Sequence, residues 1–233
     1  LVLGGEAPPE PKGNLLLDLL FNAEIHWTGE RRKGEDIPQL VIDLKAMGKK
    51  PYVIPYGGSN TIGAIGFTAA MLELHQQLNQ MNERADHIVF ASSSGGTQSG
   101  LMVGKRLLES SCNLIGINID KDEVFGMTLE TYIPRLAENV AAELNLNFSF
   151  TEDDFTLSSH YLGGGYGVIG ELEREAINLT ASLEGVILDP VYTGRAMGGL
   201  IDMIRNRIFS PEETVLFWHT GGSPALFAYG DKL

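Results

Sequence analysis

The sequence lacks the features on which several classes of protein depend. Its 233 residues contain a single cysteine, Cys112, so neither an intrachain disulfide nor a cysteine-rich zinc site can form. No apolar run is long enough to cross a bilayer. The chain has 17 basic residues against 30 acidic ones, and its formal net charge of -13 opposes sequence-independent binding to nucleic acid. These shortages predict a cytoplasmic protein that binds neither nucleic acid nor membrane.

Several catalytic signatures are missing as well. The sequence contains no Gly-Lys-Ser/Thr ending of a nucleotide-phosphate loop, no dinucleotide glycine fingerprint and no Gly-x-Ser-x-Gly elbow. The histidines show no metal-ligand spacing, and we expect each to be structural: His26, His75, His87, His160 and His219. The acidic run at 152–154 is interpreted as a solvated turn. These absences count against a nucleotide-binding oxidoreductase, a serine hydrolase and a metalloenzyme.

What is present is an alternation of short apolar segments with amphipathic ones. Hydrophobic residues make up 43% and charged residues 20% of the chain, the balance of a folded globular protein. The expected strands are 1–3, 51–54, 87–91, 113–117 and 215–218. The expected helices are 15–21, 35–47, 62–81, 98–108, 129–144, 171–182 and 196–208. The alternation predicts an α/β fold with parallel sheets. Because the first strand has no element before it, we expect the sequence to begin inside a domain.

Glycine is abundant, and it gathers with hydroxyl side chains where the predicted strands end. The strongest case is the Ser-Ser-Ser-Gly-Gly-Thr-Gln-Ser run at 92–99, which follows strand 87–91 and opens a helix. Glycines let backbone N–H groups approach an anion, hydroxyls add hydrogen bonds, and a helix N-terminus favours negative charge. The run therefore predicts a phosphate site, although a tight turn capped by serine explains the same residues.

Four further loops combine glycine with polar or aromatic residues, at 55–60, 163–167, 188–195 and 219–224. Taken singly, each is explained by a helix cap or by a surface loop, and Asn60 is expected to cap the following helix. Taken together, they predict a shared ligand crevice beyond the carboxyl ends of the strands.

These segments resemble the fold-type II pyridoxal-phosphate enzymes, in the branch of D-cysteine desulfhydrase, 1-aminocyclopropane-1-carboxylate deaminase and L-cysteate sulfo-lyase. The resemblance is carried by residues 52–59, 94–101, 183–197 and 219–229, of which the last two stretches are the most specific. It implies a tryptophan synthase β-like fold with three-layer, open twisted sheets and two domains. Residues 1–55 would be the remainder of the small α/β domain, and residues 56–233 the large α/β domain with the phosphate loop.

The resemblance also implies three groups of site residues. The loop around the phosphate of the cofactor, pyridoxal 5'-phosphate, matches Ser94, Gly95, Gly96 and Thr97. The tyrosines beside the substrate and the cofactor ring, expected to be catalytic, match Tyr166 and Tyr192. The positions that face the pyridine nitrogen match Thr193 and Thr220. The resemblance implies no metal.

One departure from the family pattern bears on mechanism. The family's Schiff-base lysine sits in an N-terminal Asn-Lys motif, which is followed by a Ser-Asn-His stretch, and neither occurs in this sequence. The lysines that do occur match no such motif: Lys12, Lys33, Lys45, Lys49, Lys50, Lys105, Lys121 and Lys232. We expect the N-terminal part to be missing, and a natural pseudoenzyme is the alternative.

The two threonines favour one reaction within this family. The resemblance places an acidic residue in the deaminase where this chain has Thr193, and a leucine where it has Thr220. A neutral threonine cannot hold a proton on the pyridine nitrogen as a carboxylate does. We therefore expect α,β-elimination of D-cysteine to pyruvate, hydrogen sulfide and ammonia, by a homodimer whose ligand is a small amino acid. L-cysteate sulfo-lyase, the deaminase and an inactive ligand-binding module remain as alternatives.

Overall fold

A computed structural model describes residues 1–31, 34–120, 123–124 and 126–233. The lysines Lys33 and Lys121 lie outside the described residues. The chain forms two compact units, whereas the predicted domains run 1–55 and 56–233. The first unit contains Leu1–Ile54 with Pro224–Gly230, and the second contains Pro55–Ser223 with Asp231–Leu233.

The first unit is built on two short parallel strands. β1 (Val2–Leu3) pairs with β2 (His26–Trp27), and the helices α1 (Asn14–Leu20) and α2 (Ile37–Ala46) belong to the same unit. The carboxylate of Asp36 lies 3.0 Å from His26 Nε2 and 2.9 Å from Arg31 Nη2, which ties the start of α2 to β2.

The strand predicted at 51–54 is wrong. The structure assigns no strand to this segment, and the side chains of Tyr52, Val53 and Ile54 are exposed. Proline flanks the segment at positions 51 and 55, and proline has no N–H to donate to a neighbouring strand. The apolar residues thus gave a strand-like pattern in a segment that pairs with no described strand.

The second unit contains the main sheet, a parallel sheet of four strands. Its order is β7 (Thr156–Ser158), β4 (Asn113–Asn118), β3 (His87–Ser92) and β8 (Val215–Trp218). The three longer strands were predicted from their apolar runs, and the predicted α/β class with a parallel sheet is confirmed. A two-stranded antiparallel pair, β5 (Glu123–Val124) and β6 (Met127–Thr128), lies apart from this sheet.

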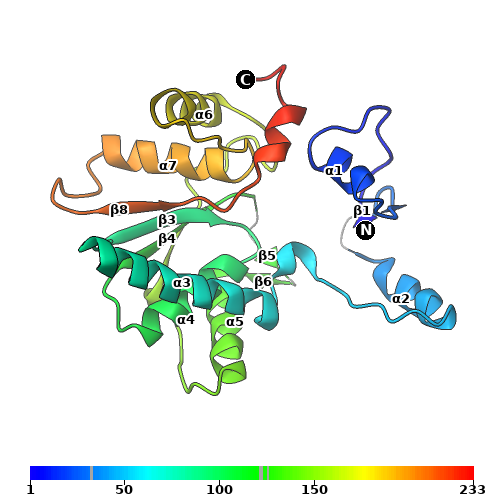
Figure 1. The fold of residues 1–233 in the computed structure, drawn as a ribbon, viewed down its shortest axis with the longest axis horizontal. Coiled ribbons are helices and arrows are strands. Elements are labelled where there is room, and N and C mark those ends of the chain that lie inside the picture. The colour runs from blue at the N-terminus through cyan, green and yellow to red at the C-terminus, as the bar shows by residue number, and fades with distance from the viewer. Residues whose placement is uncertain (32–33, 121–122, 125) are drawn as a thin grey trace. The chain divides into compact units, whose positions relative to one another are not determined.

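Helices cover both faces of the sheet, which makes three layers (Figure 1). One face carries α3 (Thr61–Met81), α4 (Gly96–Leu107) and α5 (Leu129–Glu143), and the other carries α6 (Glu171–Glu184) and α7 (Thr193–Arg205). Asn60 caps α3 as predicted, since its side chain accepts from the Gly63 N–H at 2.8 Å. No helix in the described part of the chain is long and apolar enough to cross a membrane.

The helices on the first face pack closely because glycines line their contact. A Cβ on Gly100 would lie 2.2 Å from the carbonyl oxygen of Ala64, and one on Gly104 would lie 2.6 Å from Met71 Cβ. The core between these helices and the sheet is apolar, and its fully buried members include Phe90, Leu101, Ile133 and Val140. The core therefore fixes α4 against β3, and with it the turn that joins them.

Candidate active site

Loops at the carboxyl ends of β3 and β8 enclose a cavity of about 380 Å³ within the second unit. This volume lies within the range of small-molecule sites in proteins. The residues predicted to bind the cofactor phosphate, together with Tyr192 and Thr220, are among those that line it: Ser94, Gly95, Gly96, Thr97, Tyr192 and Thr220. The structure thus brings six of the eight predicted site residues to one place.

The turn from β3 into α4 presents backbone groups to this cavity. Gly95, at the N-cap of α4, has φ 84°, a left-handed conformation that glycine adopts without strain. The first N–H groups of a helix have no acceptor within the helix, and the positive end of the helix dipole lies beside them. The turn therefore has the donors that a phosphate requires.

Ser59 joins the loop before α3 to this turn. Its side chain is almost fully buried, and its hydroxyl oxygen accepts from the Gly96 N–H at 3.0 Å and lies 2.7 Å from Ser94 Oγ. Its carbonyl oxygen accepts from the Tyr132 hydroxyl at 2.9 Å. The sequence placed Ser59 beside Asn60, and either side chain could have capped the following helix. The signal available was its place at the end of the Tyr-Gly-Gly-Ser stretch that carries the resemblance.

The two loops interlock through a glycine and a serine from each. A Cβ on Gly57 would lie 2.3 Å from Ser94 Oγ, and a Cβ on Gly96 would lie 2.6 Å from Ser59 Oγ. Each serine therefore fills the space that the other loop's glycine leaves open, and a side chain at either glycine would push the loops apart.

Asp189 organises the turn that carries Tyr192. Its carboxylate is fully buried and accepts from the backbone N–H groups of residues 191, 192 and 193 at 2.8 to 2.9 Å. It also accepts from the Thr193 hydroxyl at 2.7 Å, whose oxygen in turn accepts from the Asp189 N–H at 2.8 Å. Sequence reasoning assigned Asp189 no role, because a tight turn of this kind is visible only from its hydrogen bonds.

Thr193 consequently lies behind the cavity wall. Its side chain is fully buried, and it is not among the described residues that line the cavity. Its hydroxyl makes two hydrogen bonds with Asp189, one as donor and one as acceptor. The structure thus gives Thr193 a place in the turn, and its predicted contact with the pyridine nitrogen stays a prediction.

The loop after β8 carries Thr220 to the cavity. His219 Nδ1 accepts from the Gly221 N–H at 3.0 Å, so its Nε2 carries the proton and donates to the Ile187 carbonyl at 2.9 Å. A Cβ on Gly222 would lie 2.7 Å from Asp189 Oδ1, so the loop packs directly on the buried carboxylate. Asp189 therefore lies beside both threonines' loops, the two that are predicted to face the pyridine nitrogen.

The tyrosines form a connected set. The hydroxyls of Tyr166 and Tyr192 lie 2.6 Å apart, with their rings edge to face at 5.9 Å between centroids. Tyr56 lines the same cavity as Tyr192. Burial, aided by these two neighbours, raises the pKa of Tyr192 above that of an ordinary tyrosine. Tyr192 is therefore held in its protonated form.

A buried ion pair supports the loop that carries Tyr166. Arg195 Nε donates to Glu173 Oε1 at 2.6 Å, while its two terminal nitrogens donate to the carbonyls of Ile119 and Val168 at 2.6 and 2.9 Å. Glu173 Oε2 accepts from the Gly170 N–H at 2.8 Å. Both side chains are almost fully buried. The contacts with Val168 and Gly170 join α7 and α6 to the segment around 163–170, and the contact with Ile119 joins α7 to the residue that follows β4. The ion pair therefore holds this segment in place through Val168 and Gly170.

The composition of the cavity fits pyridoxal phosphate. The described residues that line it include no charged side chain, so an anion would be held by N–H groups, hydroxyls and the start of α4. A Cβ built on Gly58 or Gly221, which both line the cavity, would meet no atom within 4 Å. The backbone at these two positions faces open space.

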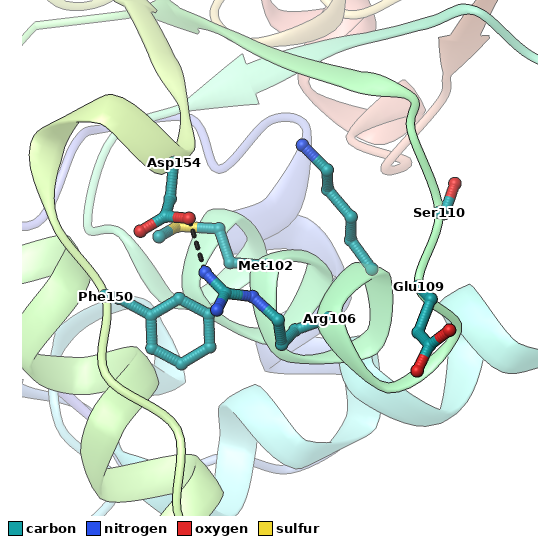
Figure 2. A pocket seen from close by; sticks show the side chains of 7 residues that line it. Met102, Arg106, Glu109, Ser110, Phe150 and Asp154 are labelled. Carbon is teal, nitrogen blue, oxygen red and sulfur yellow. Dashed lines mark hydrogen bonds and ion pairs between the residues drawn. The ribbon is translucent and has the colours of Figure 1, made fainter.

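A second cavity of about 290 Å³ lies at the far end of α4 (Figure 2). Arg106 lies over the ring of Phe150, with its guanidinium carbon 5.2 Å from the ring centroid, and pairs with Asp154 at 2.5 Å. The charges of Arg106 and Asp154 thus neutralise each other at this cavity. None of the predicted site residues lines it.

Comparisons with known proteins agree with this geometry. The family described as "Pyridoxal-phosphate dependent enzyme" matches residues 2–221. This chain belongs to that family. It is 41% identical over 225 residues to a D-cysteine desulfhydrase of Klebsiella pneumoniae (strain 342), a match that covers 95% of this chain and 66% of the relative.

Solved structures place the fold within the same group of enzymes. The crystal structure of an ACC deaminase homologue covers 100% of this chain and 68% of its own, with a TM-score of 0.86 and 34% sequence identity. Threonine deaminase isoform 2 from Solanum lycopersicum matches at a TM-score of 0.60 and 13% identity, a likeness of fold alone. The predicted fold-type II architecture and the pyridoxal-phosphate cofactor are confirmed.

Proposed function

We propose that the full-length protein carrying this sequence is a pyridoxal-phosphate-dependent lyase that converts D-cysteine to pyruvate, hydrogen sulfide and ammonia. The observation that carries the proposal is the 41% identity to D-cysteine desulfhydrase over nearly the whole chain. Because the chain spans 66% of the length of that relative, the activity belongs to the proposal rather than to the family assignment.

The residues of the cavity would divide the work of holding the cofactor and the substrate. The phosphate would be bound by the turn at the start of α4, which contains Ser94, Gly95, Gly96 and Thr97. The hydrogen bonds of this turn to Ser59 would fix where the phosphate lies in the cavity. When bound, pyridoxal phosphate draws electrons from the bonds at the substrate Cα and so makes elimination accessible. Tyr192, kept protonated by its surroundings, would hold its proton as a donor beside the ligand.

Thr193 and Thr220 would favour elimination over ring opening by different routes. Thr220 lines the cavity and would offer a neutral hydroxyl to the ring, whereas a carboxylate would hold a proton on the pyridine nitrogen. Thr193 would act through the turn, since its hydroxyl is engaged with Asp189. A substrate with a good leaving group at Cβ can undergo elimination even when the pyridine nitrogen is less readily protonated.

A substrate comparison tests the proposal. The full-length protein, supplied with pyridoxal phosphate, is given D-cysteine, the cyclopropane amino acid and L-cysteate at equal concentrations. We expect pyruvate and sulfide from D-cysteine, little 2-oxobutanoate from the cyclopropane substrate, and little sulfite from cysteate. Preference for either of the other substrates would refute the proposal, and cofactor binding without any turnover would favour an inactive ligand-binding module.

We also propose a cytoplasmic homodimer, on the strength of the resemblance. The single cysteine, Cys112, is buried and reduced, which suits a reducing compartment. Sedimentation equilibrium of the full-length protein should give twice the mass of one chain, and a monomer mass would contradict the dimer.

A further inference from the structure

The hydroxyl of Ser59 has a hydrogen-bond partner on each side, and both belong to the proposed phosphate turn. Its oxygen accepts from the Gly96 N–H at 3.0 Å and lies 2.7 Å from Ser94 Oγ. Gly96 is the first residue of α4, so its N–H has no acceptor within the helix. The structure gives this donor to Ser59, although the resemblance counts Gly96 among the residues that bind the phosphate.

The hydrogen bond between the two serines can run in either direction, and burial distinguishes the two cases. A serine hydroxyl has one proton to donate, and its oxygen can accept two hydrogen bonds. If Ser94 donated, the hydroxyl hydrogen of Ser59 would need another acceptor. Ser59 is 2% exposed, and its hydroxyl has no third partner among the described residues. A buried donor without an acceptor is costly, so this direction is disfavoured.

The opposite direction leaves no buried donor unsatisfied. If Ser59 donates to Ser94, the remaining hydroxyl hydrogen belongs to Ser94, which is half-buried and lines the cavity. A ligand or solvent in the cavity can accept it. The neighbouring Ser93 gives a contrast, because its hydroxyl donates to the Asp120 carboxylate at 2.8 Å and its proton is already engaged.

We propose that Ser59 is a positioning residue for the cofactor phosphate, whose hydroxyl donates to Ser94 and leaves the Ser94 hydroxyl to donate into the cavity. The hydrogen bonds then run one way, from the Gly96 N–H to Ser59, from Ser59 to Ser94, and from Ser94 to a phosphate oxygen. The inference rests on the proposed placement of the phosphate at this turn.

This direction strengthens the contact that Ser94 makes. Hydrogen bonds that run one way polarise one another, so Ser94 is a stronger donor than an isolated hydroxyl. The Gly96 N–H lies at the positive end of the α4 dipole, and its partial charge acts on the phosphate through the two serines. Gly96 therefore contributes to phosphate binding without touching the phosphate.

Cofactor binding to the full-length protein tests this arrangement and needs no turnover. Pyridoxal phosphate is titrated by calorimetry into the cofactor-free unaltered protein, Ser59→Ala, Ser94→Ala and the double variant. Ser94→Ala removes a hydrogen bond to a charged group, so the dissociation constant should rise about 10- to 100-fold. Ser59→Ala should raise it about 3- to 10-fold, because Ser94 loses its orientation and its polarisation. In the Ser94→Ala background, Ser59→Ala should add less than about twofold, because it acts through Ser94.

Two further measurements separate this role from a structural one. Pyridoxal, which lacks the phosphate, should bind equally well to Ser59→Ala and to the unaltered protein. The ³¹P NMR signal of the bound cofactor should move in Ser59→Ala, because it reports the hydrogen bonds at the phosphate.

The matched control is Thr68→Val, which removes another buried hydroxyl that bonds to α4. Thr68 is 3% exposed, donates to the Gly100 carbonyl at 3.0 Å, and is not among the described residues that line the cavity. This variant should change neither the dissociation constant nor the ³¹P signal. If Ser59→Ala does not fold, as circular dichroism would show, Ser59→Cys takes its place in the comparison, since a thiol is only a weak donor.

The possible failures are distinguishable. Tighter binding by Ser59→Ala would overturn the proposal, because Ser59 would then compete with the phosphate for the Gly96 N–H. Additive effects in the double variant, or an equal loss with pyridoxal, would overturn it as well. An unchanged affinity in Ser94→Ala would refute the placement of the phosphate at this turn, and the inference with it. If the unaltered protein fails to turn over D-cysteine, the proposed reaction fails, and the binding measurements still decide the role of Ser59.

Discussion

The buried pair of Glu173 and Arg195 allows a prediction of large magnitude. Glu173→Ala would remove the only carboxylate that contacts the Arg195 guanidinium among the described residues, and would also remove the acceptor of the Gly170 N–H. The guanidinium charge would then stay buried with two carbonyl partners alone. Breaking a buried pair by removing one partner costs about 3–5 kcal/mol, a large part of the ~5–15 kcal/mol by which a domain is stable.

Urea unfolding followed by circular dichroism measures this loss. The matched control is Glu175→Ala, because Glu175 and Arg205 join the same two helices at 2.6 Å with both side chains about half exposed. Exposed pairs contribute little, so the control should lose far less stability. Replacing both buried partners, with Glu173→Leu and Arg195→Met, should recover most of the loss, because no uncompensated charge remains. The reasoning is refuted if Glu173→Ala is no more destabilising than Glu175→Ala.

Three further outcomes follow from the structure. Asp189→Asn should lower kcat/KM by about tenfold or more, because an amide nitrogen would face backbone donors of the Tyr192 turn; unchanged steady-state kinetics would contradict this. Burial, with the hydrogen bond to Asp202, raises the pKa of Tyr161 to about 12, above the value of about 10 in an unfolded chain. The folded state thus keeps a proton that the unfolded state has lost, so stability should fall as the pH rises from about 10 to about 12, and fall less in Tyr161→Phe, as thermal melts would reveal. Borohydride reduction of this chain with pyridoxal phosphate should label no single lysine, and peptide mapping that finds one dominant site would refute the lysine assignment.

The sequence predicted the elements that depend on local pattern. The apolar runs at 87–91, 113–117 and 215–218 became the longest strands of the sheet, and Asn60 became the cap of α3. The short strand β7 (Thr156–Ser158) was missed, because three residues with two hydroxyls carry no strand pattern of their own. It is a strand only because β4 lies beside it.

The residues of the site also divide into those that the sequence could predict and those that it could not. Its glycine and hydroxyl loops could be found from the sequence, since phosphate binding needs those residue types at a strand end. The role of Asp189 could not, because it depends on the detailed path of one turn. Ser59 was marked only by its place in the Tyr-Gly-Gly-Ser stretch, because its contact with Gly96 is visible only in the fold. Thr193 illustrates the limit, since its residue type suits a ring contact while its hydroxyl is bonded to Asp189.

The interlocked loops around Gly57 and Ser94 restrict how this site can change in evolution. A side chain at position 57 fits only if position 94 loses its hydroxymethyl group, whereas one at position 96 would meet both the hydroxyl of Ser59 and its Cα. Substitutions in one loop are therefore conditional on the other, although 35 residues separate Ser59 from Ser94. Among relatives, positions 57 and 94 should therefore vary together, and position 96 should stay glycine. An exchange such as Gly57→Ser requires Ser94→Gly to relieve the contact, and it must also bear the left-handed φ of 63° at position 57, so a differently shaped phosphate turn needs changes in both loops.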